Sequence, residues 1–393
     1  SADDATINLG TSSNAFTGAL LLTTNDSGAD TAGDVSIHGG TTAMIIGAST
    51  IDGDLTLTST ATGAKTMTDT GTLNIRGRTT ISASSVDVTL NTVTNNFQGA
   101  LAIDGVNVTV VITNDIDLAA SNVTGNYTLT TGGSVTNSGA IAITGVTTID
   151  ASSGNVTLNT ATNNFQGAVK IDSINVAVLD AGAIDLGAST VTGTYAVIAI
   201  TGDISNSGNL TITGAANFIT TASGRHIILD QSGNVFTSTV TMQAGNGSNA
   251  AFGNITFVDS AAVRLNSSAA SAGDLYINAS TDGAVGGNLS VTAAGNITQD
   301  VVLAVTGNTT LAAGSSNNIT LANASNNFQG AVKITTGNNV TIVDADAIDL
   351  GASTVTGTYA VTATTGNISD SGNLAVTGTA TFITGASGSN IIL

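Results

Sequence analysis

The sequence lacks proline, cysteine and tryptophan, and every one of its 26 acidic residues is an aspartate. Only 8% of the 393 residues are charged, against roughly 25% in an ordinary soluble domain. Residues that favour helices, such as glutamate, lysine and arginine, are scarce, whereas threonine, valine, isoleucine, glycine and asparagine are abundant. Because 41% of the residues are hydrophobic, too many for a disordered chain, the composition predicts an ordered all-β protein.

Positive charge is equally scarce. Seven lysines and arginines give a net charge of −19 at pH 7. So few cations cannot line a basic groove or a basic membrane-binding patch, so we expect no nucleic-acid partner and no binding to anionic membranes. No apolar run approaches the roughly 20 residues that a membrane-spanning helix needs, which predicts no membrane insertion.

Internal repeats organise the chain. The hexapeptide Asn-Asn-Phe-Gln-Gly-Ala begins at Asn95, Asn163 and Asn326, and weaker copies surround Phe16 and Phe236. This spacing predicts one continuous repeat structure over residues 1–393, built from five long modules of uneven length. Their predicted bounds are residues 1–80, 81–150, 151–229, 230–311 and 312–393.

Two modules are near duplicates. The segment Gly-Ala-Ser-Thr-Val-Thr-Gly-Thr-Tyr-Ala-Val begins at both Gly187 and Gly351, and around it residues 163–229 align with residues 326–393. Such long matches favour a stackable surface over a pocket, in which each loop would differ. The predicted structural repeat positions are Phe97, Phe165, Phe328, Asn96, Asn164, Asn327, Tyr195 and Tyr359, with one phenylalanine per module stacked inside.

Short apolar segments recur about every 8 to 12 residues, each followed by glycine, asparagine, aspartate or serine, which is the spacing of strands and turns. The composition is uniform from end to end and shows no linker, which favours one solenoid over several β-sandwiches. The absence of proline agrees, because each strand in a stack needs its backbone N–H. The sequence therefore predicts a parallel β-helix, or β-solenoid, with about 20 to 24 residues per coil.

Three segments, Gly154–Leu158, Gly202–Gly208 and Asn209–Gly214, resemble the repeats of filamentous-haemagglutinin-like proteins and of β-strand-repeat bacterial surface proteins. That resemblance implies a right-handed parallel β-helix and a place in a very large secreted adhesin at the bacterial cell surface. The secretion domain of that family carries Asn-Pro motifs. Since this chain has no proline, the resemblance concerns the repeat region alone.

Candidate catalytic groups are few. His38 and His226 are far apart in the sequence and fall in different coils, which argues against a histidine-based triad or metal site. We therefore expect no catalytic residue, no bound cofactor and no enzymatic activity.

The densest acidic cluster is Asp344, Asp346 and Asp349. Asp180 and Asp185 occupy the equivalents of Asp344 and Asp349 in the duplicate module, and an active site repeated in this way would be unusual. Carboxylates at this spacing offer oxygen ligands for calcium, but neither the EF-hand pattern nor the calcium β-roll pattern is present. Calcium is thus a weak candidate ligand at these three residues.

The predicted function is an extracellular structural repeat: a surface fibre, an adhesin stalk or a biofilm matrix filament. Residues 390–393 match residues 226–229, after which another module begins, so we expect either a longer repetitive chain or self-association by head-to-tail stacking of coils. One alternative is a β-helix that binds or cleaves a carbohydrate, with a host or cell-surface glycan as partner. A second is an ice-binding β-solenoid with threonine rows, although uneven module lengths argue against one flat threonine face.

Overall fold

The computed structural model describes residues 5–11, 13–24, 33–245, 253–265, 274–277 and 284–393. The fold is a parallel β-solenoid of about 16 turns, which confirms the predicted all-β fold class. Across the described residues there are strands but no helix, and hence no helix that could cross a membrane. The chain divides into two compact units, Ser1–Asp185 and Leu186–Leu393, which are described separately below.

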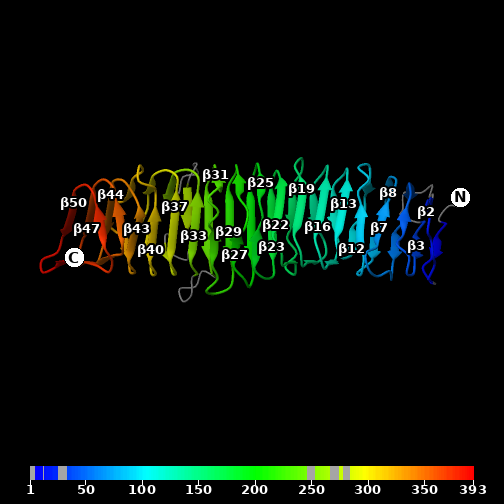
Figure 1. The fold of residues 1–393 in the computed structure, drawn as a ribbon, viewed down its shortest axis with the longest axis horizontal. Helices are drawn as coiled ribbons and strands as arrows, with labels where there is room; N and C mark the ends of the chain where they lie inside the picture. Colours follow the sequence, from blue (N-terminus) through cyan, green and yellow to red (C-terminus); the bar gives the residue numbers. More distant parts are fainter. Residues whose placement is uncertain (1–4, 12, 25–32, 246–252, 266–273, 278–283) are drawn as a thin grey trace. The chain divides into compact units, whose positions relative to one another are not determined.

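Rows of parallel strands form the first unit, in which strands of successive turns lie side by side (Figure 1). The first row contains β1 (Ile7–Leu9), β3 (Val35–His38), β6 (Leu55–Thr58), β9 (Thr79–Ser82), β12 (Leu101–Asp104), β14 (Ile116–Leu118), β17 (Val135–Asn137), β20 (Val156–Leu158) and β23 (Val176–Asp180). The second contains β2 (Ala19–Leu20), β4 (Ile45–Ile46), β7 (Thr66–Asp69), β10 (Asp87–Leu90), β13 (Val108–Ile112), β16 (Tyr127–Thr131), β19 (Thr147–Ala151) and β22 (Val169–Ser173). Shorter strands complete the turns: β5 (Ser49–Ile51), β8 (Leu73–Ile75) and β11 (Asn96–Phe97), then β15 (Ser121–Val123), β18 (Ile141–Ile143) and β21 (Asn164–Phe165).

The second unit repeats this arrangement. One row contains β26 (Tyr195–Ala199), β29 (Ala216–Thr220), β32 (Val240–Ala244), β35 (Asp274–Ile277), β34 (Val263–Leu265), β38 (Ile297–Gln299), β41 (Ile319–Leu321), β44 (Val340–Asp344), β47 (Tyr359–Ala363) and β50 (Ala380–Thr384). Another contains β27 (Ile204–Asn206), β30 (Ile227–Leu229), β33 (Ile255–Asp259), β37 (Leu289–Ala293), β40 (Thr309–Ala312), β43 (Val332–Thr336), β45 (Ile348–Leu350), β48 (Ile368–Asp370) and β51 (Ile391–Ile392). The remaining strands are β25 (Ser189–Val191), β28 (Leu210–Ile212), β31 (Val235–Phe236), β36 (Ala284–Val285), β39 (Ala304–Val305), β42 (Asn327–Phe328), β46 (Ser353–Val355) and β49 (Leu374–Val376). Strand β24 (Ile184–Leu186) spans the boundary between the units in the sequence.

Alternation along each strand decides which side chains form the core. In β13, Val108, Val110 and Ile112 are buried, whereas Thr109 and Val111 between them are partly exposed. Successive side chains of a strand point to opposite faces, so the apolar set of each turn points inward and stacks on that of the next turn. The interior is therefore filled mainly by valine, isoleucine, leucine and alanine.

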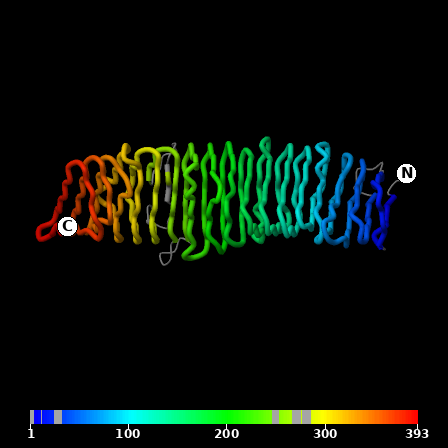
Figure 2. The backbone as a smooth tube through the Cα atoms, viewed as in Figure 1, coloured from blue at the N-terminus to red at the C-terminus, as the bar shows by residue number. Residues whose placement is uncertain are grey.

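The register between neighbouring strands gives the number of residues in each turn. Along β10, β13, β16, β19 and β22 the aligned residues are Val88, Val108, Tyr127, Thr147 and Val169, so successive turns hold 19 to 22 residues. The backbone of each unit thus winds as a regular succession of turns (Figure 2). This length is close to the one that the strand spacing predicts.

Glycine is required where neighbouring turns approach most closely. A Cβ atom on Gly99 would lie 2.3 Å from the carbonyl oxygen of Gly77, and one on Gly167 would lie 2.3 Å from that of Gly145. Real Cβ atoms essentially never come so close to another heavy atom, so no larger residue fits there without movement of the backbone. This contact explains the glycine of the Asn-Asn-Phe-Gln-Gly-Ala repeat.

Asparagine and aspartate connect the turns from the outside. The Asn107 N–H donates to Asp87 Oδ1 at 3.0 Å, and the Asn126 N–H donates to Asn107 Oδ1 at 3.0 Å. The Val146 N–H donates in turn to Asn126 Oδ1 at 2.8 Å. Each side-chain oxygen satisfies the backbone N–H that precedes a strand of the next turn, where the ladder alone would leave it unpaired. The second unit has the same row at Asn288, Asn308 and Ala331.

Candidate functional site

A polar group is buried in every copy of the hexapeptide repeat. Its first asparagine is fully buried: Asn95, Asn163 and Asn326 are each 0% exposed, as is Asn234 in the weaker copy around Phe236. A buried amide is tolerated only when its hydrogen bonds are made, because an unpaired polar group inside a protein is costly. These four asparagines are the most conspicuous polar feature of the described interior.

Asn163 shows what the buried amide does. Its Oδ1 accepts the Ile141 N–H at 3.0 Å and the Asn137 Nδ2 at 2.8 Å, both from the preceding turn. Its Nδ2 donates to the Leu158 carbonyl oxygen at 3.3 Å. One side chain therefore joins two turns and satisfies a backbone N–H at the start of β18.

The same bond recurs in the other copies. The Oδ1 of the buried asparagine accepts a backbone N–H from the preceding turn in the pairs Asn95–Leu73, Asn234–Leu210 and Asn326–Leu303, at 2.8 to 3.0 Å. A second polar side chain of the preceding turn completes each site in the pairs Asn95–Asp69, Asn234–Asn206 and Asn326–Gln299. The donor and acceptor roles of the second partner vary, but the capped N–H does not.

Buried aspartates accept the backbone N–H of the repeat phenylalanines. Asp180 Oδ2 accepts the Phe165 N–H at 2.7 Å, and its Oδ1 accepts the Gly182 N–H at 2.6 Å. Asp344 repeats this arrangement with the N–H groups of Phe328 and Asp346, both at 2.7 Å. A carboxylate one turn later therefore locks the backbone of the repeat from the other side.

Burial changes the acidity of these carboxyl groups. Desolvation raises the pKa of Asp180 and of Asp344 above 3.8, although the N–H groups that they accept act in the opposite direction. Asp259, which holds the Phe236 N–H at 3.4 Å, has its pKa raised to about 6, again mainly by burial. No cation offsets the burial of these three acids in the contacts described here.

The repeat phenylalanines lie inside, each in its own turn. Phe97, Phe165 and Phe328 are at most 2% exposed and align across the strands with Ile75, Ile143 and Val305 respectively. Each ring therefore covers an aliphatic residue of the preceding turn. The expected stack of one phenylalanine per module is thus a set of separate aromatic–aliphatic contacts.

A run of aromatic contacts occurs instead around Phe236. Its ring centroid lies 6.3 Å from that of Phe218 and 5.2 Å from that of Phe257. Tyr195 in turn contacts Phe218 edge-to-face at 5.8 Å. Three successive turns are joined by rings at this point of the second unit.

Tyr195 and Tyr359 are fully buried. Burial raises the pKa of both, that of Tyr359 to about 12, while the neighbouring Ser353 acts in the opposite direction. Tyr359 also packs edge-to-face on Phe382 at 5.9 Å. Rings enclosed in this way cannot serve as an exposed platform for a sugar.

The second asparagine of the repeat faces outward. Asn96, Asn164 and Asn327 are each partly exposed, next to the buried asparagine that carries the contacts. Asn96 Nδ2 donates to Asn74 Oδ1 of the preceding turn at 2.9 Å. The sequence marks the repeat that contains both asparagines, but the register needed to choose between them comes only from the fold.

The calcium candidates do not converge. Asp344 points inward and is fully buried, Asp346 is exposed, and Asp349 is partly exposed on β45. In the described part of the chain, no group of three or more histidine, cysteine, aspartate or glutamate side chains lies close enough to hold a metal ion. Calcium binding at these residues remains a prediction that these positions do not favour.

The histidines act as hydrogen-bond acceptors for the backbone. His226 Nδ1 accepts the Asn254 N–H at 2.8 Å, and the His226 N–H donates to Asp203 Oδ1 at 2.9 Å. It therefore takes the place of asparagine in the outer row of turn contacts. His38 Nδ1 accepts the Gly40 N–H at 3.0 Å within its own turn.

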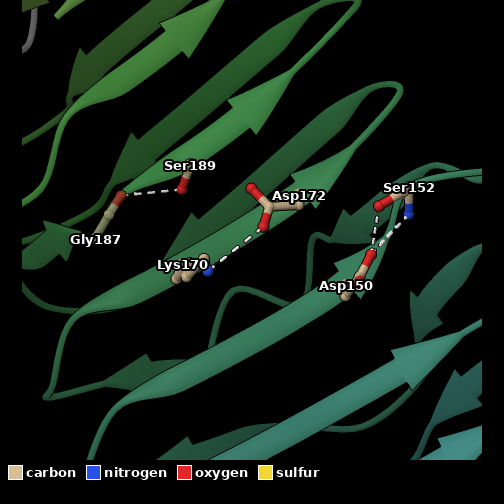
Figure 3. A network of polar contacts seen from close by, with 6 residues as sticks. All are labelled: Asp150, Ser152, Lys170, Asp172, Gly187 and Ser189. Atoms are coloured by element: carbon tan, nitrogen blue, oxygen red, sulfur yellow. Dashed lines mark hydrogen bonds and ion pairs between the residues drawn. The ribbon is translucent and has the colours of Figure 1, made fainter.

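Several polar side chains pair with their nearest neighbours (Figure 3). In the first unit, Lys170 Nζ lies 3.6 Å from Asp172 Oδ2, and the Ser152 N–H donates to Asp150 Oδ1 at 3.2 Å. In the second, Ser189 Oγ donates to the Gly187 carbonyl oxygen at 3.0 Å. The two exposed contacts contribute little to stability, Ser189 is buried, and together these residues form no convergent set of chemical groups.

A model of the family described as repeats of unknown function (DUF5649) matches five segments of the chain: residues 32–104, 105–172, 173–243, 280–335 and 337–393. No curated protein and no solved structure matches the chain. The matches support a β-strand repeat protein. The relation to filamentous-haemagglutinin-like proteins and the predicted module bounds stay predictions.

Replacing Asn163 with alanine should destabilise the first unit by about 1–3 kcal/mol, because the Ile141 N–H is left buried without a partner. Urea denaturation measures the loss, and faster hydrogen exchange of the Ile141 amide locates it. Asn164→Ala is the matched control, and it should change stability by less than about 0.5 kcal/mol since Asn164 is partly exposed. Equal losses in the two variants would contradict the assignment.

Stability should fall as the pH rises from 4 to 7, partly because of Asp259. Its folded-state pKa of about 6 lies above its ordinary 3.8, so its protonated form favours folding, and that stabilisation disappears as the pH passes 6. Asp259→Asn should reduce the pH dependence by on the order of 2 kcal/mol. Asp230→Asn, at an exposed position, is the control. Denaturation midpoints at both pH values test this, and an unchanged difference in Asp259→Asn would refute it.

Proposed function

The chain belongs to the family of repeats of unknown function (DUF5649), and we propose that it is a non-enzymatic structural repeat of an extracellular fibre, adhesin stalk or matrix filament. The observation that carries this proposal is what the buried polar side chains of the repeat bind. The asparagines and aspartates of the repeat bind backbone groups of neighbouring turns. The buried polar side chains of the repeat thus hold neighbouring turns together.

The hydrogen bonding between turns suits a role in bearing mechanical load. Parallel pairing joins each turn to the next through several backbone hydrogen bonds at once, as between β13 and β16, where five residue pairs are in register. Buried side-chain bonds such as Asn163–Ile141 add to the same connections. Separating two turns therefore requires many bonds to break together, which supports a role in bearing force.

The surface also suits exposure outside a cell. The whole chain has only seven lysines and arginines, so trypsin-like proteases have few cleavage sites. Its net charge of −19 keeps a surface rich in threonine and asparagine soluble. Carbohydrate binding is less well supported, because the chain has no tryptophan and Tyr195 and Tyr359 are buried.

Two measurements test the structural role. Immunogold labelling of intact source cells should place the chain outside the cell, and label confined to the interior would refute the proposed location.

Pulling on the chain by atomic force microscopy should give repeated rupture steps as groups of turns separate. Asn163→Ala should lower the rupture force of the first unit while Asn164→Ala leaves it unchanged, and equal forces in the two variants would refute the load-bearing role of the buried amide.

One observation favours a second candidate, an ice-binding face. In the first unit Thr68, Thr89, Thr109, Thr128 and Thr148 align in five successive turns, and all five are partly exposed. The uneven module lengths do not break this row, because register is set from each turn to the next. Its hydroxyl and methyl groups repeat at the strand spacing of about 4.8 Å, which suits ordered water.

Ice recrystallisation assays test this second candidate. The folded chain should inhibit crystal growth, and the double variant Thr109→Lys with Thr128→Lys should abolish the inhibition by disrupting the middle of the row. The matched control is Thr136→Lys with Thr157→Lys, which changes an aligned pair on a different strand row. No inhibition by the unmodified chain, or equal loss in both variants, would dismiss an ice-binding role.

A further inference from the structure

The backbone ladder between turns is reduced at two places, residues 95–119 and residues 326–351, here called the early joint and the late joint. Each begins with a complete copy of the hexapeptide repeat. In the early joint β12 and β14 pair at one position, and in the late joint β43 and β45 do the same. Five residue pairs join β44 to β47, so each joint has fewer backbone hydrogen bonds than a full ladder.

The two joints share their construction. In each, a serine hydroxyl accepts a backbone N–H that a carbonyl oxygen would accept in a regular parallel ladder. In the early joint the Ile103 N–H donates to Ser121 Oγ at 3.0 Å. In the late joint the Ile334 N–H donates to Ser353 Oγ, also at 3.0 Å. Side chains therefore replace part of the ladder at both places.

An equivalent backbone hydrogen bond closes each joint. In the late joint the Gly351 N–H donates to the Val332 carbonyl oxygen at 2.9 Å. In the early joint the Ala119 N–H donates to the Leu101 carbonyl oxygen at 2.9 Å. Because an amide exchanges its hydrogen with water only when its bond opens, these two amides report the opening of the two joints.

A carboxyl group completes the late joint. Asp344 is fully buried, and its Oδ2 accepts the Phe328 N–H at 2.7 Å across the joint. Its Oδ1 accepts the Asp346 N–H at 2.7 Å within its own turn. One ionisable side chain thus connects the hexapeptide to the turn that follows it.

An uncharged amide does the same work in the early joint. Residues 108–118 align with residues 340–350, which places Ile112 at the position of Asp344. The connection is made instead by Asn114, whose Nδ2 donates to the Phe97 carbonyl oxygen at 2.6 Å. The two joints therefore differ in whether the group that connects them can take up a proton.

The charges around Asp344 do not compensate its burial. Asp346, in the same turn, carries a like charge that acts in the same direction as burial. Lys333 on β43 is exposed and Asp349 on β45 is partly exposed, both on the outer face. Strand β47 contributes Tyr359, which stays neutral because burial raises its pKa to about 12, and β41 and β42 contribute no titratable side chain.

We propose that the late joint is a pH-sensitive latch, closed most firmly while Asp344 is protonated and opening more often once Asp344 is charged. The early joint, completed by Asn114, lacks this dependence. The latch is a local device in one turn of the second unit. It goes beyond the proposed structural role and does not depend on it.

The direction of the effect follows from the buried carboxyl. Burial raises the pKa of Asp344 above its ordinary 3.8, and the N–H groups of Phe328 and Asp346 offset only part of this. The neutral form therefore favours the closed joint. This stabilisation is fully present below pH 3.8 and is lost as the pH rises through the raised pKa.

Native-state hydrogen exchange at pH 4 and pH 7, corrected for the intrinsic pH dependence of exchange, tests the latch. Protection of the Gly351 amide should fall by roughly threefold or more between the two values, because the joint opens more often. Protection of the Ala119 amide should stay unchanged. Val340, whose N–H donates to the Thr358 carbonyl oxygen at 2.8 Å, is the control for the second unit as a whole.

Two variants assign the effect to one carboxyl group. Asp344→Asn keeps an oxygen that can accept the Phe328 N–H but cannot be ionised, so protection of Gly351 should no longer depend on pH. Asp349→Asn, at a partly exposed position of the same joint, is the matched control and should retain the full dependence. Circular dichroism should show that both variants are folded.

Two outcomes overturn the proposal. One is a loss of protection at Gly351 in the unmodified chain that is no larger than the losses at Ala119 and Val340. The other is an undiminished loss at Gly351 in folded Asp344→Asn. If Asp344→Asn does not fold, the comparison of the three amides in the unmodified chain decides alone.

Discussion

Registered pairing of each turn with the next is the interaction on which the rest of the structure depends. Every turn satisfies its backbone groups on its neighbour, as β13 does on β10 and β16. A residue without an N–H would break such a row, and a side chain at Gly99 or Gly167 would force the backbones apart. Asn107 and Asn126 belong to the same requirement, since they supply acceptors where the strands begin.

The buried polar residues extend this logic into the core. An apolar core could stack in several registers, whereas a buried Asn163 is satisfied only when Ile141 and Asn137 lie opposite it. Asp180 fixes the next turn in the same way through the Phe165 N–H. The repeat motif therefore specifies alignment between turns, at the expense of burying carboxyl groups whose charged form destabilises the fold.

Part of the site could be predicted from the sequence. The hexapeptide and the segments around Tyr195 and Tyr359 recur in the sequence, so repetition alone marks them as repeat positions. The choice of Asn163 over Asn164 could not, because adjacent residues of a strand point to opposite faces and only the register decides which is inside. The acidic cluster shows the same limit: Asp344 and Asp346 are close in sequence, yet one is buried and the other exposed.

The sequence by itself determined the fold class and the repeats, because strand and turn propensities and the absence of proline are local properties that recur along the chain. The tertiary structure alone decided which residues meet across turns. Asn95 contacts Asp69, which lies 26 positions earlier, and the row from Thr68 to Thr148 joins residues 19 to 21 positions apart in successive turns. Turn lengths vary by a few residues, and a shift of one position reverses every side chain, so these partners follow from the folded register.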